Sequence, residues 1–259
     1  MNETVNSAVT TTYNMNMVAL SFVIAAVGSF VALTVATRIR GADGRINNTN
    51  VFSAGLALGG VGVWAMHFIG MLGLNMDVAR SYSSIETLIS MVAAVAATSL
   101  ALAYAARNAE RIQHLLLAGL MLGLSVVVMH YLGMFGLKTY GYVVWDYSLV
   151  ALSVVIAVVA ATAALWLAFN TRGLGFRFGA AMVMASAVCA MHYTGMYAAS
   201  FVCTTANRNA IPQGFGYVSS FNLPTLVVVA SVMLVVLISV DQFFQAMREP
   251  INRRPSTQP

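Results

Sequence analysis

The chain has 259 residues, a formal net charge of +5, 59% apolar residues and only 8% charged residues. Soluble domains carry roughly 25% charged residues, so this composition excludes an ordinary soluble domain and indicates a membrane protein. The basic residues stand in the loops between apolar runs, where they report membrane topology and do not form a stripe for binding nucleic acid.

Seven apolar runs follow a polar N-terminal segment, and each is long enough to cross about 30 Å of hydrocarbon as a helix. The expected helices cover residues 15–37, 51–74, 85–106, 114–137, 147–169, 176–199 and 222–244. Residues 1–14 are predicted to be a tail outside the cytoplasm without a cleaved signal peptide, because they lack a basic region. Residues 245–259 are predicted to be a cytoplasmic tail or the start of a linker. The sequence therefore predicts an all-α, seven-transmembrane bundle over residues 15–244.

Basic residues are distributed unevenly between the two ends of these helices. One side has Arg38, Arg40, Arg45, Arg107, Arg111, Arg172, Arg177, Arg248, Arg253 and Arg254, and the other side has Arg80, Lys138 and Arg208. Short loops rich in Lys and Arg stay in the cytoplasm. We therefore expect the N-terminus outside, the C-terminus inside, and a multi-pass protein of the bacterial inner membrane.

A six-residue motif occurs three times, as M-H-F-I-G-M at 66–71, M-H-Y-L-G-M at 129–134 and M-H-Y-T-G-M at 191–196. One copy is expected by chance in about one such chain per thousand, so three copies form a repeat. The motifs lie on the second, fourth and sixth runs, each near the same end. The sequence thus predicts three two-helix repeats followed by a seventh helix, with His67, His130 and His192 at one depth in the outer part of the bilayer.

Imidazole and thioether groups together favour copper, especially Cu(I), over magnesium, calcium or manganese. On a helix with 3.6 residues per turn, the second methionine of each motif lies one turn after the histidine. The predicted metal ligands are His67, His130, His192, Met71, Met134 and Met196, with Met66, Met129 and Met191 as second choices. Zinc could use the histidines but gains little from methionine, and haem would use only one or two of them. A lone buried histidine is more often a packing residue, but threefold repetition at one depth favours a function.

Other polar residues have weaker patterns. Cys189 lies nearly on the same helix face as His192 and is interpreted mainly as a buried thiol, with a thiolate ligand as the alternative. His114 is assigned to the opposite membrane interface. Asp77, Glu86 and Asp146 are expected to be solvated, although one of them could hold a ligand histidine through a hydrogen bond.

Aromatic and small residues suggest packing roles. Four aromatic residues near the outer helix ends are typical of an interfacial belt, although the first could also wall the metal site; they are Trp64, Tyr142, Trp145 and Tyr147. Four glycines give the second run a face suited to close helix packing, namely Gly55, Gly59, Gly60 and Gly62. No motif of a hydrolase or nucleotide-binding enzyme is present, so we expect no catalytic activity of this chain.

At the three motifs the chain resembles the MHYT family of bacterial integral membrane sensor domains, over roughly residues 13–245. The name motif stands here as M-H-Y-T at 191–194, M-H-Y-L at 129–132 and M-H-F-I at 66–69. The first copy departs from the name motif at its last two positions, and the second copy departs at its last position. The helical geometry also turns the tyrosine ring away from the histidine face, so a role for the tyrosine hydroxyl is not expected. The resemblance implies a sensor of oxygen, carbon monoxide or nitric oxide that uses a protein-bound metal, with copper favoured. It also implies a cytoplasmic output domain or signalling partner.

Two other functions remain open on the sequence alone. A copper transporter, chaperone or storage protein would need further methionine, histidine or cysteine residues along a path, and His114 and Met121 are the only hint of one. A membrane enzyme with a copper or haem centre would leave the threefold repeat unexplained. The sequence favours the sensor and does not indicate the oligomeric state.

Overall fold

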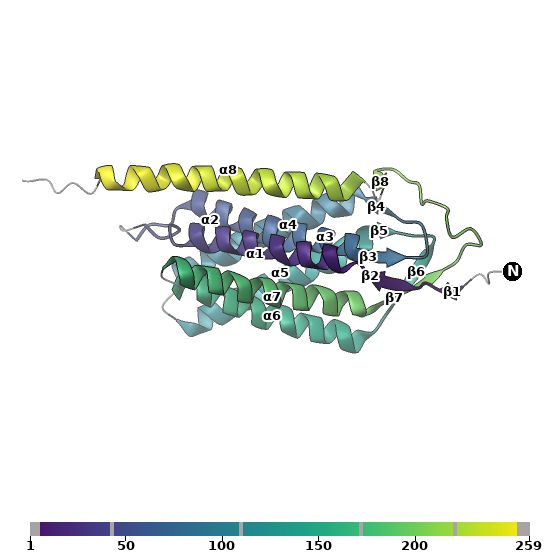
Figure 1. Ribbon diagram of the computed structural model, residues 1–259. Helices are drawn as coiled ribbons and strands as arrows, with labels where there is room; N and C mark the ends of the chain where they lie inside the picture. Colours follow the sequence, from purple (N-terminus) through teal and green to yellow (C-terminus); the bar gives the residue numbers. More distant parts are fainter. Residues whose placement is uncertain (1–5, 42–43, 109–110, 171–172, 220–221, 253–259) are drawn as a thin grey trace, which may run out of the picture.

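The computed structural model describes residues 6–41, 44–108, 111–170, 173–219 and 222–252, with the side chains of 248–252 left aside. Within these ranges, seven helices are long and apolar enough to cross a membrane, which confirms the predicted all-α architecture. They run side by side between a strand-bearing end and the opposite end (Figure 1). The helices are α1 (Met15–Ala36), α2 (Asn48–Gly55), η1 (Leu56–Ala65), α3 (Met66–Gly73), α4 (Ser84–Arg107), α5 (Ile112–Gly136), α6 (Tyr147–Asn170), α7 (Leu174–Tyr197) and α8 (Asn222–Asn252).

The second membrane span is continuous from Asn48 to Gly73 but has three parts, because the π-helix η1 joins α2 to α3. Its most apolar stretch is 89% buried, against 22–44% for the equivalent stretches of the other six spans. Glycines make this close packing possible: a Cβ on Gly59 of η1 would overlap with the backbone of Ala94 on α4, and a Cβ on Gly28 of α1 would overlap with the backbone of Gly62. This span is therefore the one that the others surround most completely.

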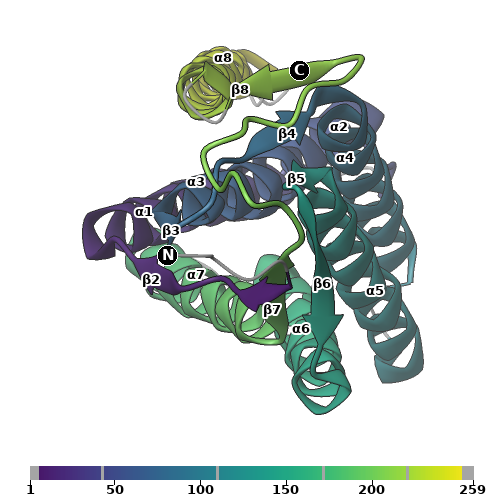
Figure 2. The ribbon, with the colours of Figure 1, turned by 90° about the vertical axis from the view of Figure 1, so that its right-hand side faces the viewer.

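The six spans from α1 to α7 form a closed ring. Contacts join α1 to η1, η1 to α4, α4 to α5, α5 to α6, α6 to α7, and α7 back to α1. Figure 2 shows this ring from the strand-bearing end, with α8 at its edge. The seventh span contacts mainly η1, α3 and α1, so it is an addition to a ring made of three two-helix repeats. Many apolar side chains on the outside of the bundle are exposed, as expected for surfaces that face lipid.

Short strands cover the end of the ring at which the motif helices terminate. The strands are β1 (Ser7–Ala8), β2 (Thr11–Tyr13), β3 (Leu74–Met76), β4 (Ser81–Ser83), β5 (Leu137–Lys138), β6 (Gly141–Trp145), β7 (Ala199–Cys203) and β8 (Tyr217–Ser219). They pair in three antiparallel sheets with the orders β1-β7-β6, β2-β3 and β5-β4-β8. The described part of the predicted N-terminal tail is thus built into this cover, and Arg208 ties it further through Ser7 and Asp77.

At the other end of the bundle, α8 continues to Asn252, past the predicted helix end at 244. A buried polar cluster fixes this helix to the ring. Nη1 of Arg38 donates to the side-chain oxygen of Gln242 at 2.8 Å, and Nε2 of Gln242 donates to Oδ1 of Asn50 at 3.2 Å. Residues 1–5 and 253–259, and the predicted cytoplasmic Arg172, Arg253 and Arg254, lie outside the described residues, as does the side chain of Arg248.

Candidate metal centre

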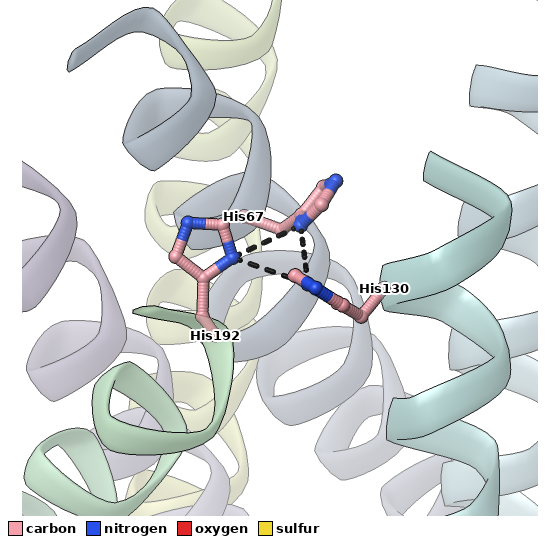
Figure 3. A group of neighbouring side chains, drawn as sticks. All are labelled: His67, His130 and His192. Carbon is pink, nitrogen blue, oxygen red and sulfur yellow. Dashed lines mark hydrogen bonds between the residues drawn. The ribbon is translucent and has the colours of Figure 1, made fainter. Parts of the chain in front are cut away.

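The three motif histidines meet at the centre of the ring, one from each repeat. His67 lies on α3, His130 on α5 and His192 on α7, and their exposed fractions are 0%, 0% and 1%. Figure 3 shows the three imidazoles facing one another edge on. Within the described residues, this is the one group of three or more His, Cys, Asp or Glu side chains that could hold a metal ion. The prediction that the three lie at one depth is therefore correct.

The Nδ1 atoms face the centre of the group. The Nδ1–Nδ1 distances are 3.1 Å from His67 to each of the other two and 3.3 Å from His192 to His130. Two nitrogen ligands of one tetrahedral metal lie about 3.3 Å apart when each metal–nitrogen bond is about 2.0 Å long. The spacing of the three nitrogens thus fits a single shared ion.

Hydrogen bonds alone cannot satisfy these three contacts. A neutral imidazole has one N–H, and a ring nitrogen that carries the proton cannot also accept in the ring plane. If one Nδ1 carries a proton, the other two face each other with lone pairs, and if two carry protons, their N–H groups face each other, so at least one of the three contacts is always unsatisfied. A cation at the centre would be bound by all three lone pairs, so this donor set fits a metal, and the neutral nitrogen ligands suit copper or zinc.

Each imidazole is held by the motif glycine of another repeat. The Nε2 atoms are buried and make no hydrogen bond to the described residues. A Cβ on Gly133 would overlap with the ring of His67, one on Gly195 with the ring of His130, and one on Gly70 with the ring of His192. The imidazole of the first repeat therefore packs against the second repeat, that of the second against the third, and that of the third against the first. The motif requires glycine because a neighbouring imidazole occupies the space of its side chain.

The hydroxyls of two motif tyrosines, for which the sequence supported no role, make a second set of contacts between repeats. The Tyr193 hydroxyl donates to Oγ of Ser21 on α1 at 2.8 Å, since that serine already donates to Val18. In the same way, Tyr131 donates to Ser153 of α6 at 2.7 Å. The rings do stand beside the triad, with centroids 4.7 Å and 4.8 Å from those of their own histidines, but their hydroxyls fasten neighbouring helices.

The first repeat has Phe68 in place of tyrosine and uses Trp64 for the same purpose. Nε1 of Trp64 donates to Oγ of Ser90 on α4 at 3.2 Å and to the carbonyl of Thr87 at 3.1 Å. Trp64 is 8% exposed, so its assignment to the interfacial belt is wrong; it packs on Phe68, which packs on His67. Sequence reasoning missed the serines, although each of the three lies on the first helix of a repeat; they are Ser21, Ser90 and Ser153.

The motif methionines are all buried. Exposed fractions are 0–3% for Met71, Met134 and Met196, and 1% for each of Met66, Met129 and Met191. Met66 packs in a small cluster with Cys189, next to Ser21 and Tyr193, which places the thiol on the α1 side of α7. The assignment of Met71, Met134 and Met196 as ligands stays a prediction.

The remaining polar candidates have other partners. Asp77 pairs with Arg208, Glu86 with Lys138, and Asp146 accepts from the backbone of Ser148, so none of these hydrogen bonds reaches the triad. His114 bonds through Nδ1 to the hydroxyl of Tyr104 at 2.7 Å, away from the metal centre. A histidine ligand held by a carboxylate, one option left open by the sequence, is therefore not among these contacts.

Comparison with known proteins identifies the family. The MHYT family, described as a bacterial signalling protein N-terminal repeat, matches residues 4–46, 60–118 and 123–181. The chain belongs to the MHYT family. The matched segments contain the first two motifs, whereas the third motif lies after them and extends the pattern. This match confirms the resemblance drawn from the motifs.

Curated relatives are bacterial signalling proteins. The chain is 38% identical over 205 residues to the bifunctional diguanylate cyclase/cyclic di-GMP phosphodiesterase MucR of Pseudomonas aeruginosa, covering 76% of this chain and 30% of MucR. It is 34% identical over 194 residues to the cyclic di-GMP phosphodiesterase NbdA of the same organism, and 28% identical over 197 residues to the signalling protein YkoW of Bacillus subtilis. These alignments cover 72% and 73% of this chain and 24% of each relative. The chain thus spans less than a third of these relatives. No solved structure matches it.

Proposed function

We propose that this MHYT domain is a copper-binding membrane sensor of diatomic gas or redox state that signals to a cytoplasmic output domain or partner protein. The carrying observation is the convergence of three buried Nδ1 atoms, 3.1–3.3 Å apart, in an arrangement that hydrogen bonds cannot satisfy. Buried ionisable groups inside membrane spans are functional as a rule. Oxygen, carbon monoxide and nitric oxide are the proposed signals.

Copper, when bound, would supply reversible gas binding and one-electron chemistry. The residues of the chain hold the three ring nitrogens in place and exclude water. Gly70, Gly133 and Gly195 back the rings, so an imidazole cannot tilt without pushing on a helix of another repeat. The buried aromatic and methionine side chains around the triad keep its surroundings apolar.

A route to the output passes through the second span. His67 begins that route, since it is the second residue after η1, and both η1 and α3 contact α8. π-Helical segments inside α-helices occur frequently at functional sites, and η1 is such a segment within the second span. We therefore propose that a change at the triad is passed through η1 to α8, which leads to the output domain.

The distribution of basic residues supports an orientation with the strand-bearing end outside the cytoplasm and the end of α8 inside, in the bacterial inner membrane. In this orientation the helix that leaves the bundle would enter the compartment of cyclic di-GMP enzymes. Relatives that combine such a match with a printed cyclic di-GMP activity support this choice of output.

A copper transporter is the second candidate, and the geometry favours it less. Transport requires several stations along a path, whereas the triad is the one candidate metal group of His, Cys and acidic side chains in the described part of the chain. The three histidines of the triad are themselves only 0–1% exposed. A single enclosed site suits retention of an ion better than its passage.

Elemental analysis of the purified protein in detergent or nanodiscs tests the proposal. We expect about one copper per chain. The triple variant His67→Ala, His130→Ala, His192→Ala should lose the ion, whereas His114→Ala, away from the triad, should keep it. Retention of stoichiometric copper by the triple variant would show that the site is elsewhere.

A further inference from the structure

A small cavity of about 30 Å³ lies among the three motif helices and α6, on the side of the triad away from the strands. Three of its lining residues, Val63, Val126 and Val188, each stand four residues before a triad histidine, and thus about one helical turn below it. Met191, which also lines the cavity, is the chain neighbour of His192. All three motif helices therefore contribute to the wall of this cavity directly beneath the imidazoles.

The cavity reaches toward the outside of the bundle on one side of the ring. Its remaining wall is built largely from alanines of α6, namely Ala157, Ala160, Ala161 and Ala164, and from Ala187 of α7. Ala160 and Ala187 are half-buried, unlike Ala157 and Ala161, which are buried. Short side chains at the contact between α6 and α7 thus leave the space near the surface that faces the hydrocarbon of the membrane.

The chemistry of the wall limits what can occupy this space. Every lining side chain is a hydrocarbon or a thioether, without a hydroxyl, amide or charge. Apolar cavities remain dry because a buried water needs two to four polar partners, yet they bind xenon and small apolar molecules. An ion is excluded by the cost of desolvation. A volume of about 30 Å³ exceeds the roughly 10–15 Å³ needed for one molecule of the size of water.

We propose that this cavity is the docking site and lateral access route for an uncharged diatomic gas, which enters from the hydrocarbon between α6 and α7 and meets the triad from below. The proposal rests on the proposed function in assigning the gas to the triad. It adds the cavity in which the gas binds, the two helices between which the gas enters, and the reason that ions and water are excluded from the cavity.

Dissolved dioxygen, which is paramagnetic, provides a test that needs no bound metal. Methyl groups of ¹³C-methionine in the metal-free protein would be observed by NMR in nanodiscs under increasing oxygen pressure. Met184 and Met191 line the cavity, whereas Met71 and Met129 are equally buried and do not. We expect oxygen to relax the first pair at least about threefold more than the second pair.

Substitutions in α6 locate the access route. Ala160→Leu should fill the mouth of the cavity and reduce the relaxation of Met191 toward that of Met71. Ala163→Leu makes the same change at an exposed position of the same helix and should have no effect. Equal relaxation of all four methionines in the wild-type protein would overturn the proposal, and so would an unchanged Met191 in Ala160→Leu. Absence of copper from the wild-type protein in the elemental analysis would instead refute the proposed function. The two results are independent, because the relaxation is measured on metal-free protein.

Discussion

The imidazole of His67 lies against the backbone of Gly133, where its Nε2 takes the space that a Cβ of that residue would occupy. The two residues belong to different repeats, and the same relationship holds for His130 with Gly195 and for His192 with Gly70. The backbone of each motif glycine thus forms the surface on which a histidine of another repeat packs, which explains why the two residue types occur together in each copy.

Gly133→Ala should displace the ring of His67 and weaken copper binding by about 10- to 100-fold, the usual effect of disturbing groups around a metal ligand. The α5 helix itself should persist, because alanine is a better helix former than glycine by about 1 kcal/mol. Competition with a copper chelator gives the affinity. Gly136→Ala in the same helix is the control, since its Cβ would make an ordinary 3.5 Å contact. Equal copper affinities of the two variants would contradict the proposal that the glycine positions the ring of His67.

Tyr193→Phe and Ser21→Ala should destabilise the protein in a coupled way. The hydroxyl of Tyr193 donates to Ser21 and joins α7 to α1, where the ring of helices closes. A hydrogen bond of this kind contributes about 1 kcal/mol, and removing both partners should cost less than the sum of the single changes.

Reversible unfolding in mixed detergent would measure this coupling energy in a double-mutant cycle. The pair Tyr193→Phe and Ser153→Ala is the matched control, because Ser153 accepts from Tyr131 on the other side of the ring. Coupling as strong in this control pair would mean that the measured value does not come from the hydrogen bond.

Tyr13→Phe should reduce the sensitivity of the protein to high pH. Burial, followed by the nearby phenols of Tyr197 and Tyr193, raises the pKa of Tyr13 from 10.0 to about 12. A raised folded-state pKa means that its contribution to stability is complete below pH 10 and is lost as the pH rises toward 12. The free energy of unfolding should therefore fall less between pH 10 and pH 12 in Tyr13→Phe than in the wild type. Tyr147→Phe, which changes an 80% exposed ring, should follow the wild type.

Gln242→Leu should loosen α8 from the ring at the end opposite the strands. The side chain of Gln242 is 6% exposed and binds both Arg38, just after the first span, and Asn50 of the second. The change removes the buried hydrogen bond to Oδ1 of Asn50, whereas Nη1 of Arg38 keeps its bond to the backbone carbonyl of residue 242, and losing such a bond costs about 1–3 kcal/mol. Hydrogen exchange of backbone amides in α8 should accelerate about tenfold or more around this residue.

Gln245→Leu is the control for this variant, because Gln245 bonds to Asp241 within its own helix. If both variants exchange alike, α8 is held by its apolar contacts and not by the polar cluster.

The sequence predicted the membrane spans well because hydrocarbon thickness sets the length of each apolar run. All seven predicted helices correspond to spans, with ends that differ by a few residues. Periodicity also placed His67, His130 and His192 on equivalent helices, and equal depth followed from the repeat. These results depend on local patterns that one helix expresses by itself.

Contacts between repeats could not be predicted in the same way. The choice of Nδ1 as the inward atom depends on the space beside each glycine, which belongs to another helix. Trp64 resembled a belt residue because it lies toward the outer part of its predicted helix, yet its ring packs on Phe68 and its indole N–H donates to Ser90 of α4, and neither contact is visible in its own helix. The serine partners had no motif of their own, and the strands formed by the polar N-terminus depend on pairing with residues far along the chain.

The cyclic packing of the three histidines on the glycines of other repeats also bears on the evolutionary origin of the domain. A single hairpin contains a motif histidine and a motif glycine, but each histidine packs on the glycine of another hairpin, so the triad requires three hairpins at once. An ancestral gene encoding one hairpin would have needed to assemble as a homotrimer, and fusion of three copies would then have freed each to diverge. In this chain the first repeat differs from the other two, because Trp64 beside Phe68 makes the contact to a serine that a tyrosine makes in the others.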